Sequence, residues 1–307
     1  MVQDHDRVVI VGAGHVGATV AYALMLRALF REIILIDSDT ALAGAEAADI
    51  ADAGVLARPT LVRAGSYADA ASAGIAILTA GAATHGSESR LSVAGRSADI
   101  MRACVADLMA AGFDGILLAA ANPVDLMALV ALEASGLPAT RVIGTGTLLD
   151  SSRLRHQLAR RMAIAPAFVD AMVLGEHGDS SFAALSLARV GGVAIDPDID
   201  RATVEHTVRE AASRIIAGKG YTSFGVATAI VRICEAIVRD ERAVLPVSTL
   251  MTGHYGIEGL YLSLPCVIGG DGVGRVLEPE LDEGEVAAFR ASAGVLQDAL
   301  EALRQRS

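Results

Sequence analysis

Tryptophan is absent from this chain of 307 residues, and the other aromatic residues are scarce, with six Phe and five Tyr. Proteins that bind single-stranded nucleic acid without sequence preference stack the bases on aromatic side chains. Basic residues are also few: 25 Lys and Arg stand against 36 Asp and Glu, a formal net charge of -11, and they form no dense stripe. The composition therefore argues against a nucleic-acid partner, and an anionic substrate would need local positive charge.

Cysteine is sparse as well. Cys104, Cys234 and Cys266 are odd in number, lack C-x-x-C spacing and lie in apolar surroundings. We expect reduced core thiols in a cytoplasmic protein. The first residues are acidic rather than basic, so we expect no signal peptide. The seven histidines are scattered without H-x-x-x-H spacing or a Cys/His cluster, so we expect no metal site.

One stretch, residues 8–30, is apolar enough to imitate a membrane span. Glycines near its start and Arg27 near its end favour a buried strand, turn and helix instead, and we expect no membrane partner. The chain is long enough for one large α/β unit or two coupled domains, and about half its residues are apolar, which allows a sizeable core.

The first half alternates short β-type runs with Ala-rich helical runs. The runs are mostly continuous and apolar, as in a parallel sheet covered on both faces. This alternation predicts a doubly wound parallel sheet of the Rossmann type over residues 1–145. The predicted strands are 8–11, 32–37, 60–64, 74–80 and 115–120, and the predicted helices are 15–29, 41–53, 97–111 and 124–135.

The second half of the chain lacks this regular alternation of strands and helices, and its pattern predicts an α+β substrate-binding and catalytic domain over residues 146–307. We see no flexible linker at the boundary. The predicted helices are 150–161, 201–219, 224–238 and 282–303, and the predicted strands are 167–174, 244–249, 259–264 and 267–268.

A G-x-G-x-x-G motif follows the first strand directly and opens a helix. Gly12 would allow the tight turn, Gly14 the approach of a pyrophosphate to the backbone, and Gly17 the packing of helix on strand. Asp37 ends the second strand, where a carboxylate accepts hydrogen bonds from ribose hydroxyls and repels a 2′-phosphate. The pattern predicts an NAD site, although Asp37 alone could also be an ordinary loop or helix-cap residue.

The segment Gly-Glu-His-Gly-Asp at 175–179 places His177 between glycines and carboxylates. Histidine titrates near neutral pH and can exchange a proton with a substrate, but a histidine in a glycine-rich turn is also common on ordinary surfaces. Asp150 and Arg153 share one face of a predicted helix. Asp150 could orient His177 and raise its pKa, and Arg153 could hold a substrate carboxylate through two hydrogen bonds. By sequence alone, however, an Asp/Arg pair at this spacing is usually an exposed ion pair.

Two further segments follow predicted strand ends. Arg90 lies in a long polar stretch that we expect to be a loop, one able to close over a substrate and supply a cation, or else an incidental surface arginine. Asn122 precedes Pro123 after the fifth strand, where a ligand crevice is expected, and a cis peptide bond is plausible there.

Taken together, these motifs resemble the lactate/malate dehydrogenase family across nearly the whole chain. The resemblance implies hydride transfer between NAD and an (S)-2-hydroxy acid or its 2-keto acid. It makes His177 the proton donor and acceptor, Asp150 its orienting partner, Arg90 the group that polarises the carbonyl and Arg153 the carboxylate clamp. The matching segments are 12–17, 37, 81–82, 88–91, 122–125, 150–153, 175–179 and 219–222.

The resemblance also implies further contacts. Asn122 would contact substrate and cofactor, and Tyr67, Val16, Gly81 and Ala82 would line the cofactor groove. The alternative of a non-catalytic relative predicts loss of the catalytic set, which is intact. The family is oligomeric, so we expect a homo-oligomer, a tetramer or a dimer.

Two positions favour the lactate branch, and one follows neither branch. Glu88 and Thr222 match lactate dehydrogenases, whereas Thr84 stands where malate enzymes carry arginine and lactate enzymes glutamine. Without that arginine a dicarboxylate is a poor first substrate, unless His85 supplies a cation. The smaller threonine leaves room for a 2-keto acid bulkier than pyruvate, as in hydroxyisocaproate- or phenyllactate-type enzymes.

Many bacterial lactate dehydrogenases bind fructose 1,6-bisphosphate through an arginine and a histidine. Arg155 matches the arginine, but Asp170 stands in place of the histidine. A carboxylate would repel the phosphates, so we expect no activation by this sugar bisphosphate.

Overall fold

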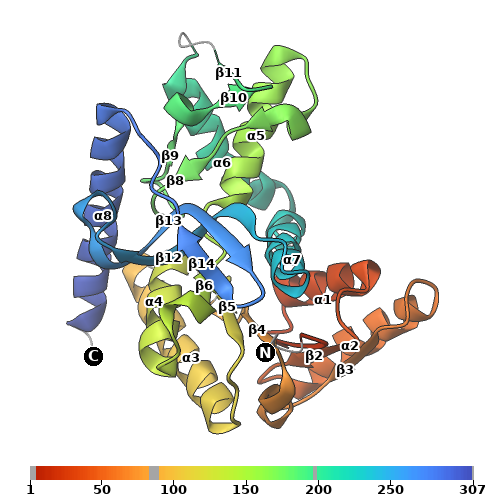
Figure 1. The fold of residues 1–307 in the computed structure, drawn as a ribbon. Coiled ribbons are helices and arrows are strands. Elements are labelled where there is room, and N and C mark those ends of the chain that lie inside the picture. The colour runs from red at the N-terminus through yellow and green to blue at the C-terminus, as the bar shows by residue number, and fades with distance from the viewer. Residues whose placement is uncertain (1–4, 83–89, 196–198, 306–307) are drawn as a thin grey trace.

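A nine-stranded sheet forms the centre of the computed structural model, which describes residues 5–82, 90–195 and 199–305, without the side chains of 90–92 (Figure 1). Six of its strands pair in parallel in the order β3-β2-β1-β4-β5-β6, so the strand order reverses between β1 and β4. The predicted doubly wound sheet is confirmed, and β6 is an addition to it. These strands are β1 (Arg7–Val11), β2 (Glu32–Ile36), β3 (Leu61–Ala64), β4 (Ile75–Leu78), β5 (Ile116–Ala119) and β6 (Val142–Gly144).

Three antiparallel strands from the second half extend the same sheet beyond β6, so the sheet is mixed rather than purely parallel. They are β12 (Ala243–Thr252), β13 (Glu258–Gly269) and β14 (Gly272–Val276). β12 pairs with β6 where Ser248 faces Gly144. The two strands approach closely there, since a Cβ at position 144 would lie only 2.8 Å from the Cβ of Ser248. The prediction of two separate strands at 259–264 and 267–268 was wrong, because one strand, β13, runs unbroken through Pro265.

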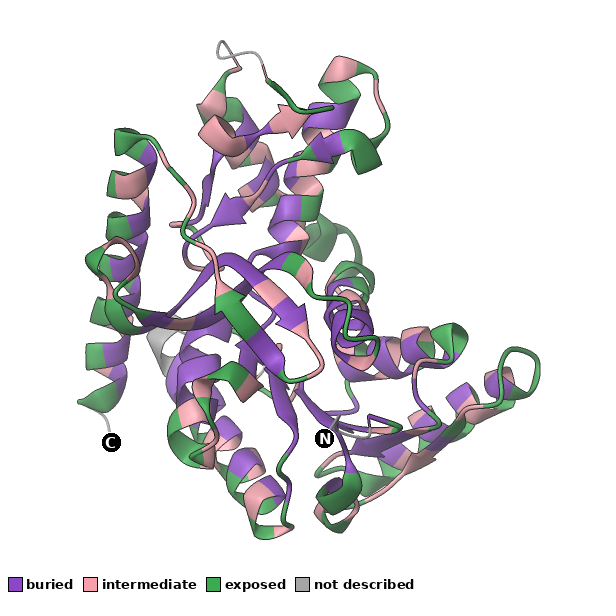
Figure 2. Cartoon of the chain, in the orientation of Figure 1, coloured by how far each residue is buried: buried purple, intermediate pink, exposed green. Residues whose placement is uncertain are grey.

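Helices cover both faces of this sheet (Figures 1 and 2). Because side chains alternate along a strand, Val8 and Ile10 belong to the core cluster that includes residues of α1, α2 and α7, whereas Val9 and Val11 belong to the cluster that includes residues of α3, α4 and α8. The helices are α1 (His15–Arg27), α2 (Thr40–Val55), α3 (Arg90–Ala110), α4 (Val124–Ser135), α5 (Leu148–Met162), α6 (Arg201–Lys219), α7 (Phe224–Val238) and α8 (Glu283–Arg304).

A smaller unit at the top of Figure 1 combines α5 and α6 with short strands around a third core. Its strands are β7 (Val169–Asp170), β8 (Val173–Leu174), β9 (Phe182–Ala183), β10 (Arg189–Val190) and β11 (Val193–Ala194). The single strand predicted at 167–174 was wrong: β7 and β8 belong to different small sheets. Short 3-10 helices lie at η1 (Tyr67–Ser72), η2 (Ala139–Arg141), η3 (Pro166–Phe168), η4 (Leu185–Leu187) and η5 (His254–Gly256).

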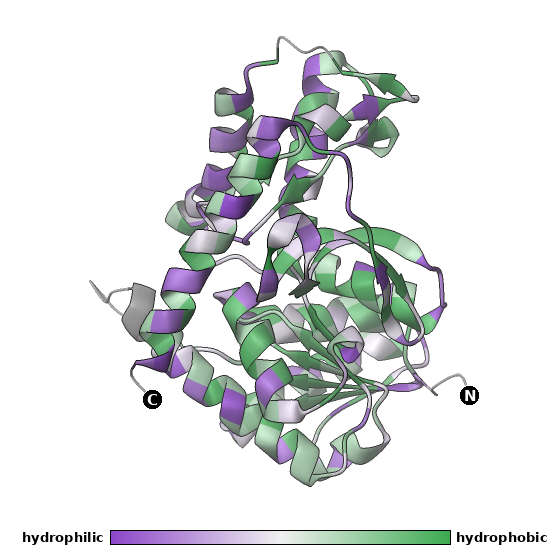
Figure 3. Ribbon diagram, turned by 60° about the vertical axis from the view of Figure 1, so that its left-hand side comes forward, coloured by the Kyte–Doolittle hydropathy of each residue, from purple (hydrophilic) through white to green (hydrophobic). Residues whose placement is uncertain are grey.

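The apolar stretch 8–30 forms β1 and α1, as expected, and hydrophobic residues gather in the central strands (Figure 3). None of the helices in the described ranges is long and apolar enough to cross a membrane. The three cysteines are free thiols, with Cys234 and Cys266 buried and Cys104 partly buried. Helix α3 begins at Arg90 rather than at 97, since its polar first turns lack the apolar spacing that marks a helix.

An aromatic cluster packs helix α8 against the rest of the fold, and we predict that its loss lowers the free energy of unfolding. Phe289 is fully buried, with its ring 5.1 Å from that of Tyr255 and 6.3 Å from that of Phe182. Phe289→Ala should lower the free energy of unfolding by about 3–5 kcal/mol, through lost burial and the remaining cavity. Urea denaturation measures this, with Val295→Ala, 49% exposed on the same helix, as the control. Equal losses in the two variants would contradict the assignment.

Candidate active site

The glycine-rich turn after β1 is tightly packed at two positions and open at a third. Gly12 has φ +105°, and a Cβ there would lie 2.7 Å from the backbone nitrogen of Ala80. A Cβ at Gly17 would lie 1.8 Å from the carbonyl oxygen of Gly12, whereas nothing lies within 4 Å of a Cβ at Gly14. The turn therefore brings helix close to strand and leaves space at Gly14, where a pyrophosphate would meet the N-terminus of α1.

Asp37 lies beside this turn at the end of β2. Its Oδ2 accepts a hydrogen bond from the backbone N–H of Ala13 at 2.7 Å, and its Oδ1 accepts one from the N–H of Asp39 at 2.9 Å. The carboxylate is thus held next to the glycines, in the position that a ribose-binding acid requires. Contact with ribose stays a prediction.

The other residues predicted for the cofactor groove also lie in or after the ends of the parallel strands. Val16 lies in the first turn of α1, and Ala82, just after Gly81, donates its backbone N–H to the Ser97 hydroxyl at 3.2 Å. Tyr67 lies in η1 after β3, where burial, then the Cys104 thiol, raises the pKa of its hydroxyl. Asn122 is exposed after β5, and the Asn122-Pro123 bond is cis, as the sequence suggested.

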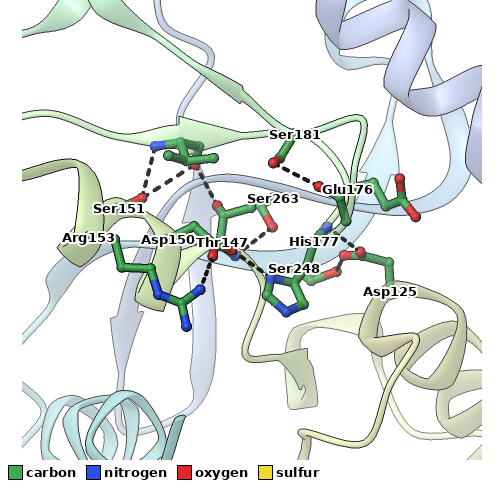
Figure 4. A network of polar contacts seen from close by, with 12 residues as sticks. Asp125, Thr147, Asp150, Ser151, Arg153, Glu176, His177, Ser181, Ser248 and Ser263 are labelled. Carbon is green, nitrogen blue, oxygen red and sulfur yellow. Dashed lines mark hydrogen bonds and ion pairs between the residues drawn. The ribbon is translucent and has the colours of Figure 1, made fainter. Parts of the chain in front are cut away.

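His177, Asp150 and Arg153 converge in the structure (Figure 4). Nδ1 of His177 lies 2.6 Å from Oδ2 of Asp150, and Nη1 of Arg153 donates to Oδ1 of the same carboxylate at 2.8 Å. The Asp150 side chain is only 9% exposed, against 27% for His177. The Asp150 carboxylate therefore contacts both His177 and Arg153. Because it engages Nδ1 of the imidazole, the other ring nitrogen, Nε2, is left available for a further hydrogen bond.

The pKa values of this cluster follow from its charges. Burial by itself would lower the pKa of His177, but the Asp150 carboxylate, and then that of Asp125, outweigh it and raise the pKa. Burial would raise the pKa of Asp150, yet His177 and Arg153 outweigh it and lower the pKa. An anionic Asp150 thus keeps His177 protonated to higher pH than an ordinary histidine.

Hydrogen bonds to buried hydroxyls tie helix α5 to the strand that leads to His177. Thr147 donates its hydroxyl to the carbonyl of Val173 at 2.5 Å, and Ser151 accepts from the N–H of Val173 at 2.9 Å. The N–H of Thr147 donates to the hydroxyl of Ser263 on β13 at 3.1 Å. The start of α5, which carries Asp150, is therefore fixed to β8 and to the central sheet.

Asp125 is a buried acid that the sequence analysis noted only as part of a motif. Its Oδ2 accepts the backbone N–H of His177 at 2.7 Å, and its Oδ1 accepts the Ser248 hydroxyl at 2.5 Å. It is 1% exposed, and burial raises its pKa to about 6 despite these bonds. The signal available in the sequence was an acid in the first turn of an otherwise apolar helix, which usually serves only as a cap.

Helix α8 holds the same loop from the other side. The Ser292 hydroxyl accepts the N–H of Glu176 at 2.8 Å and bonds with the hydroxyl of Ser180 at 3.0 Å, and Ser180 donates to the Glu176 carboxylate. Glu176 therefore lies within the hydrogen bonds that fix the loop.

A ring stack joins the cofactor turn to the segment that carries Thr222. The rings of His15 and Tyr221 are 3.8 Å apart and inclined by 10°, and Nζ of Lys219 lies 4.3 Å from the centroid of Tyr221. Thr222 is partly buried and comes directly after this stack. The sequence placed His15 in the glycine motif but gave no signal for this contact.

Four residues named in the sequence analysis cannot be placed in the site. Thr84, His85 and Glu88 lie outside the described residues, and so does the side chain of Arg90, whose backbone begins α3. Burial lowers the pKa of the Arg155 guanidinium, and the Asp170 carboxylate opposes this shift only in part. Within the described ranges, no group of three or more His, Cys, Asp or Glu is arranged to hold a metal ion.

Comparison with known proteins identifies the class to which this fold and site belong. Residues 6–144 match the family model of the lactate/malate dehydrogenase NAD binding domain, and residues 147–306 match that of the lactate/malate dehydrogenase alpha/beta C-terminal domain. The chain belongs to the lactate/malate dehydrogenase family.

Its similarity is to the L-lactate dehydrogenases of that family. The chain is 43% identical to L-lactate dehydrogenase of Thermus aquaticus, over 97% of this chain and 99% of that one. It is 42% identical to L-lactate dehydrogenase of Limosilactobacillus reuteri, over 97% and 94%. The crystal structure of minor L-lactate dehydrogenase from Enterococcus mundtii in the ligands-bound form is 37% identical, with TM-score 0.94 over 96% and 97% of the two chains. This protein is an NAD-dependent 2-hydroxy acid dehydrogenase of the L-lactate dehydrogenase type.

Asp125 generates a prediction about the pH dependence of the enzyme. Asp125→Asn removes a negative charge beside His177, so the pKa of His177 should fall. The pH at which kcat/KM for keto-acid reduction declines should move lower, and kcat/KM at pH 7.5 should drop roughly tenfold to a hundredfold, since a buried hydrogen-bonding group is worth about 1–3 kcal/mol. Steady-state kinetics from pH 5 to 9 measures both effects.

The wild type supplies an internal control in this experiment. Below about pH 6 Asp125 itself becomes protonated, so the two enzymes should converge there. Asp298→Asn, at an exposed position of α8, removes the same charge at the surface and should leave the profile in place. A change in rate without any change in the pH profile would show that Asp125 acts only through packing.

Proposed function

We propose that this chain interconverts an (S)-2-hydroxy acid and its 2-keto acid, with L-lactate and pyruvate as the first pair to test, and that His177 exchanges the proton. The observation that carries the proposal is the convergence of His177, Asp150 and Arg153 within hydrogen-bonding distance. The relatives named above are called L-lactate dehydrogenases, which supports the same pair.

The proton step follows from the charges around His177. With Nδ1 held by Asp150, the remaining ring nitrogen, Nε2, donates its proton to the oxygen of a keto acid in the reducing direction. In the oxidising direction the neutral ring accepts the proton of the hydroxyl group. Because the Asp150 carboxylate raises the pKa of His177, reduction should persist to higher pH than an ordinary histidine would allow, and oxidation should need a higher pH.

Arg153 would bind the substrate carboxylate. Its side chain is 17% exposed, and its guanidinium donates one N–H to Asp150, which leaves further donors for a second carboxylate. Thr222, Asn122 and Thr84 are proposed substrate contacts, and Arg90 the group that polarises the carbonyl. These four roles depend on the family resemblance.

NAD, when bound, supplies or accepts the hydride. Gly12, Gly14 and Gly17 would seat its pyrophosphate, and Asp37 its ribose, and the open space at Gly14 fits this use. The groove would continue along Val16, Tyr67, Gly81, Ala82 and Asn122. We further propose a cytoplasmic homo-oligomer, a tetramer or a dimer, whose activity does not respond to fructose 1,6-bisphosphate, because the carboxylate of Asp170 would repel the phosphates of that ligand.

The role of His177 predicts the effect of one substitution. His177→Asn should lower kcat on the order of 10²–10⁴-fold, the usual worth of a general acid or base, while NADH binding is kept. Stopped-flow kinetics and NADH fluorescence titration measure the two quantities. His206→Asn, an exposed histidine on α6 paired with Glu210 at 3.3 Å, is the matched control and should keep its rate. A near-normal rate in His177→Asn would refute the mechanism.

A second candidate differs in the substrate side chain. Thr84 is smaller than the glutamine of lactate dehydrogenases and lacks the charge of the malate arginine, so it favours a bulkier, uncharged 2-keto acid. Malate is disfavoured for the same reason, since a second carboxylate would be buried without a partner.

A substrate panel decides between the candidates. If Thr84 opens the pocket, kcat/KM for 2-ketobutyrate, 2-ketoisocaproate or phenylpyruvate should exceed that for pyruvate, and oxaloacetate should be poorest. Thr84→Gln should restore preference for pyruvate, and Thr84→Arg should raise activity on oxaloacetate at least tenfold. NADH oxidation at 340 nm follows each reaction. Pyruvate leading the wild-type panel by a wide margin would leave L-lactate as the substrate and reject the bulkier one.

A further inference from the structure

Two stacked rings connect the glycine turn after β1 with the segment that joins α6 to α7. The imidazole of His15 and the phenol ring of Tyr221 are inclined by only 10°, and their centroids are 3.8 Å apart. Stacked rings attract each other beyond the burial of their surfaces. The two residues come from opposite halves of the chain, at the place where α1 packs beside α7 (Figure 1). The stack is therefore a tertiary contact, which neither backbone segment requires by itself.

The His15 side of the stack belongs to the proposed cofactor site. His15 is the first residue of α1 and directly follows Gly14. Nothing lies within 4 Å of a Cβ at Gly14, and this is the space in which the pyrophosphate would meet the N-terminus of the helix. The N–H of Ala18 donates to the carbonyl of Gly14 at 2.9 Å, so the first turn of α1 is hydrogen-bonded. A ligand seated at Gly14 would therefore lie one residue away from the stacked imidazole.

The Tyr221 side belongs to the proposed substrate site, because Tyr221 precedes Thr222. Helix α6 ends at Lys219, and Gly220 turns the chain there with φ +87°. Ser223 is buried, and its carbonyl accepts the N–H of Ala227 at 2.9 Å where α7 begins. The connection is thus anchored at both ends. Between these anchors, the position of Thr222 depends on how the neighbouring ring of Tyr221 is held.

An ammonium group also contacts this ring. Nζ of Lys219 lies 4.3 Å from the ring centroid of Tyr221 and 4.3 Å from that of Phe224. A cation over an aromatic face is attracted by the quadrupole of the ring. Lys219 and Phe224 belong to the two helices that flank the connection, whereas His15 belongs to the cofactor turn. His15 is therefore the partner through which the cofactor turn can act on Tyr221.

We propose that His15 and Tyr221 are positioning residues that couple cofactor binding to keto-acid binding, an inference that rests on the proposed function. A cofactor seated at Gly14 would fix the start of α1 and with it the imidazole. The imidazole then holds the Tyr221 ring, and the ring holds Thr222 where it would meet the substrate. Because the connection is ordered when the cofactor binds, the keto acid meets a contact that is already in place.

Substitutions of the two rings test the coupling in steady-state kinetics at saturating NADH. His15→Ala should raise KM for the keto acid about threefold to tenfold, the usual worth of an aromatic pair, and leave kcat within about twofold. Tyr221→Ala should have the same effect, and the double variant should be no worse than either single variant, since both remove one contact. His15→Phe keeps a flat ring and should restore KM.

Hydrogen exchange tests the coupling without any turnover. In the wild type, NADH should slow the exchange of the amides of residues 219–223 about fivefold or more, since exchange reports local opening. In His15→Ala this slowing should fall to about twofold or less although NADH still binds, and His15→Phe should recover it. Fluorescence titration confirms NADH binding. A stack that only stabilised the fold would change exchange equally with and without NADH.

His254→Ala is the matched control, because it removes an imidazole from η5, between β12 and β13. It should keep both KM and the NADH-dependent slowing, and thermal unfolding checks that each variant is folded. Wild-type KM and slowing in His15→Ala, losses that add in the double variant, or no recovery in His15→Phe would overturn the proposal. Failure of the proposed function would show separately, as a wild type that slows exchange on binding NADH but turns over no keto acid.

Discussion

The contact between Asp150 and His177 is the interaction on which the site depends. A carboxylate buried to this degree is costly unless it is paired, and here it is paired twice, with an imidazole at 2.6 Å and a guanidinium at 2.8 Å. The same pairing that stabilises Asp150 as an anion raises the pKa of His177 and orients its ring. The buried ion pair and the proposed chemistry therefore have one physical cause.

That contact joins segments that come from different parts of the fold. Asp150 belongs to α5, which begins just after β6, whereas His177 lies in a loop after β8. Hydroxyl groups of α5 and β13 hold the start of the helix, Asp125 of α4 holds the backbone of His177, and Ser292 of α8 holds the residue before it. The antiparallel extension of the central sheet is what brings α4, α5 and β13 together, since β12 pairs directly with β6.

The sequence by itself determined the parallel half of the fold and the glycine turn with Asp37, because these depend on local periodicity and local turns. The set His177, Asp150 and Arg153 was expected from the family resemblance, not from any local pattern. Only the tertiary structure decided that β12 extends the sheet and that Asp125 supports His177. Only it paired His15 with Tyr221. Those contacts join residues far apart in the chain, and no local pattern specifies which distant side chain will meet a given residue.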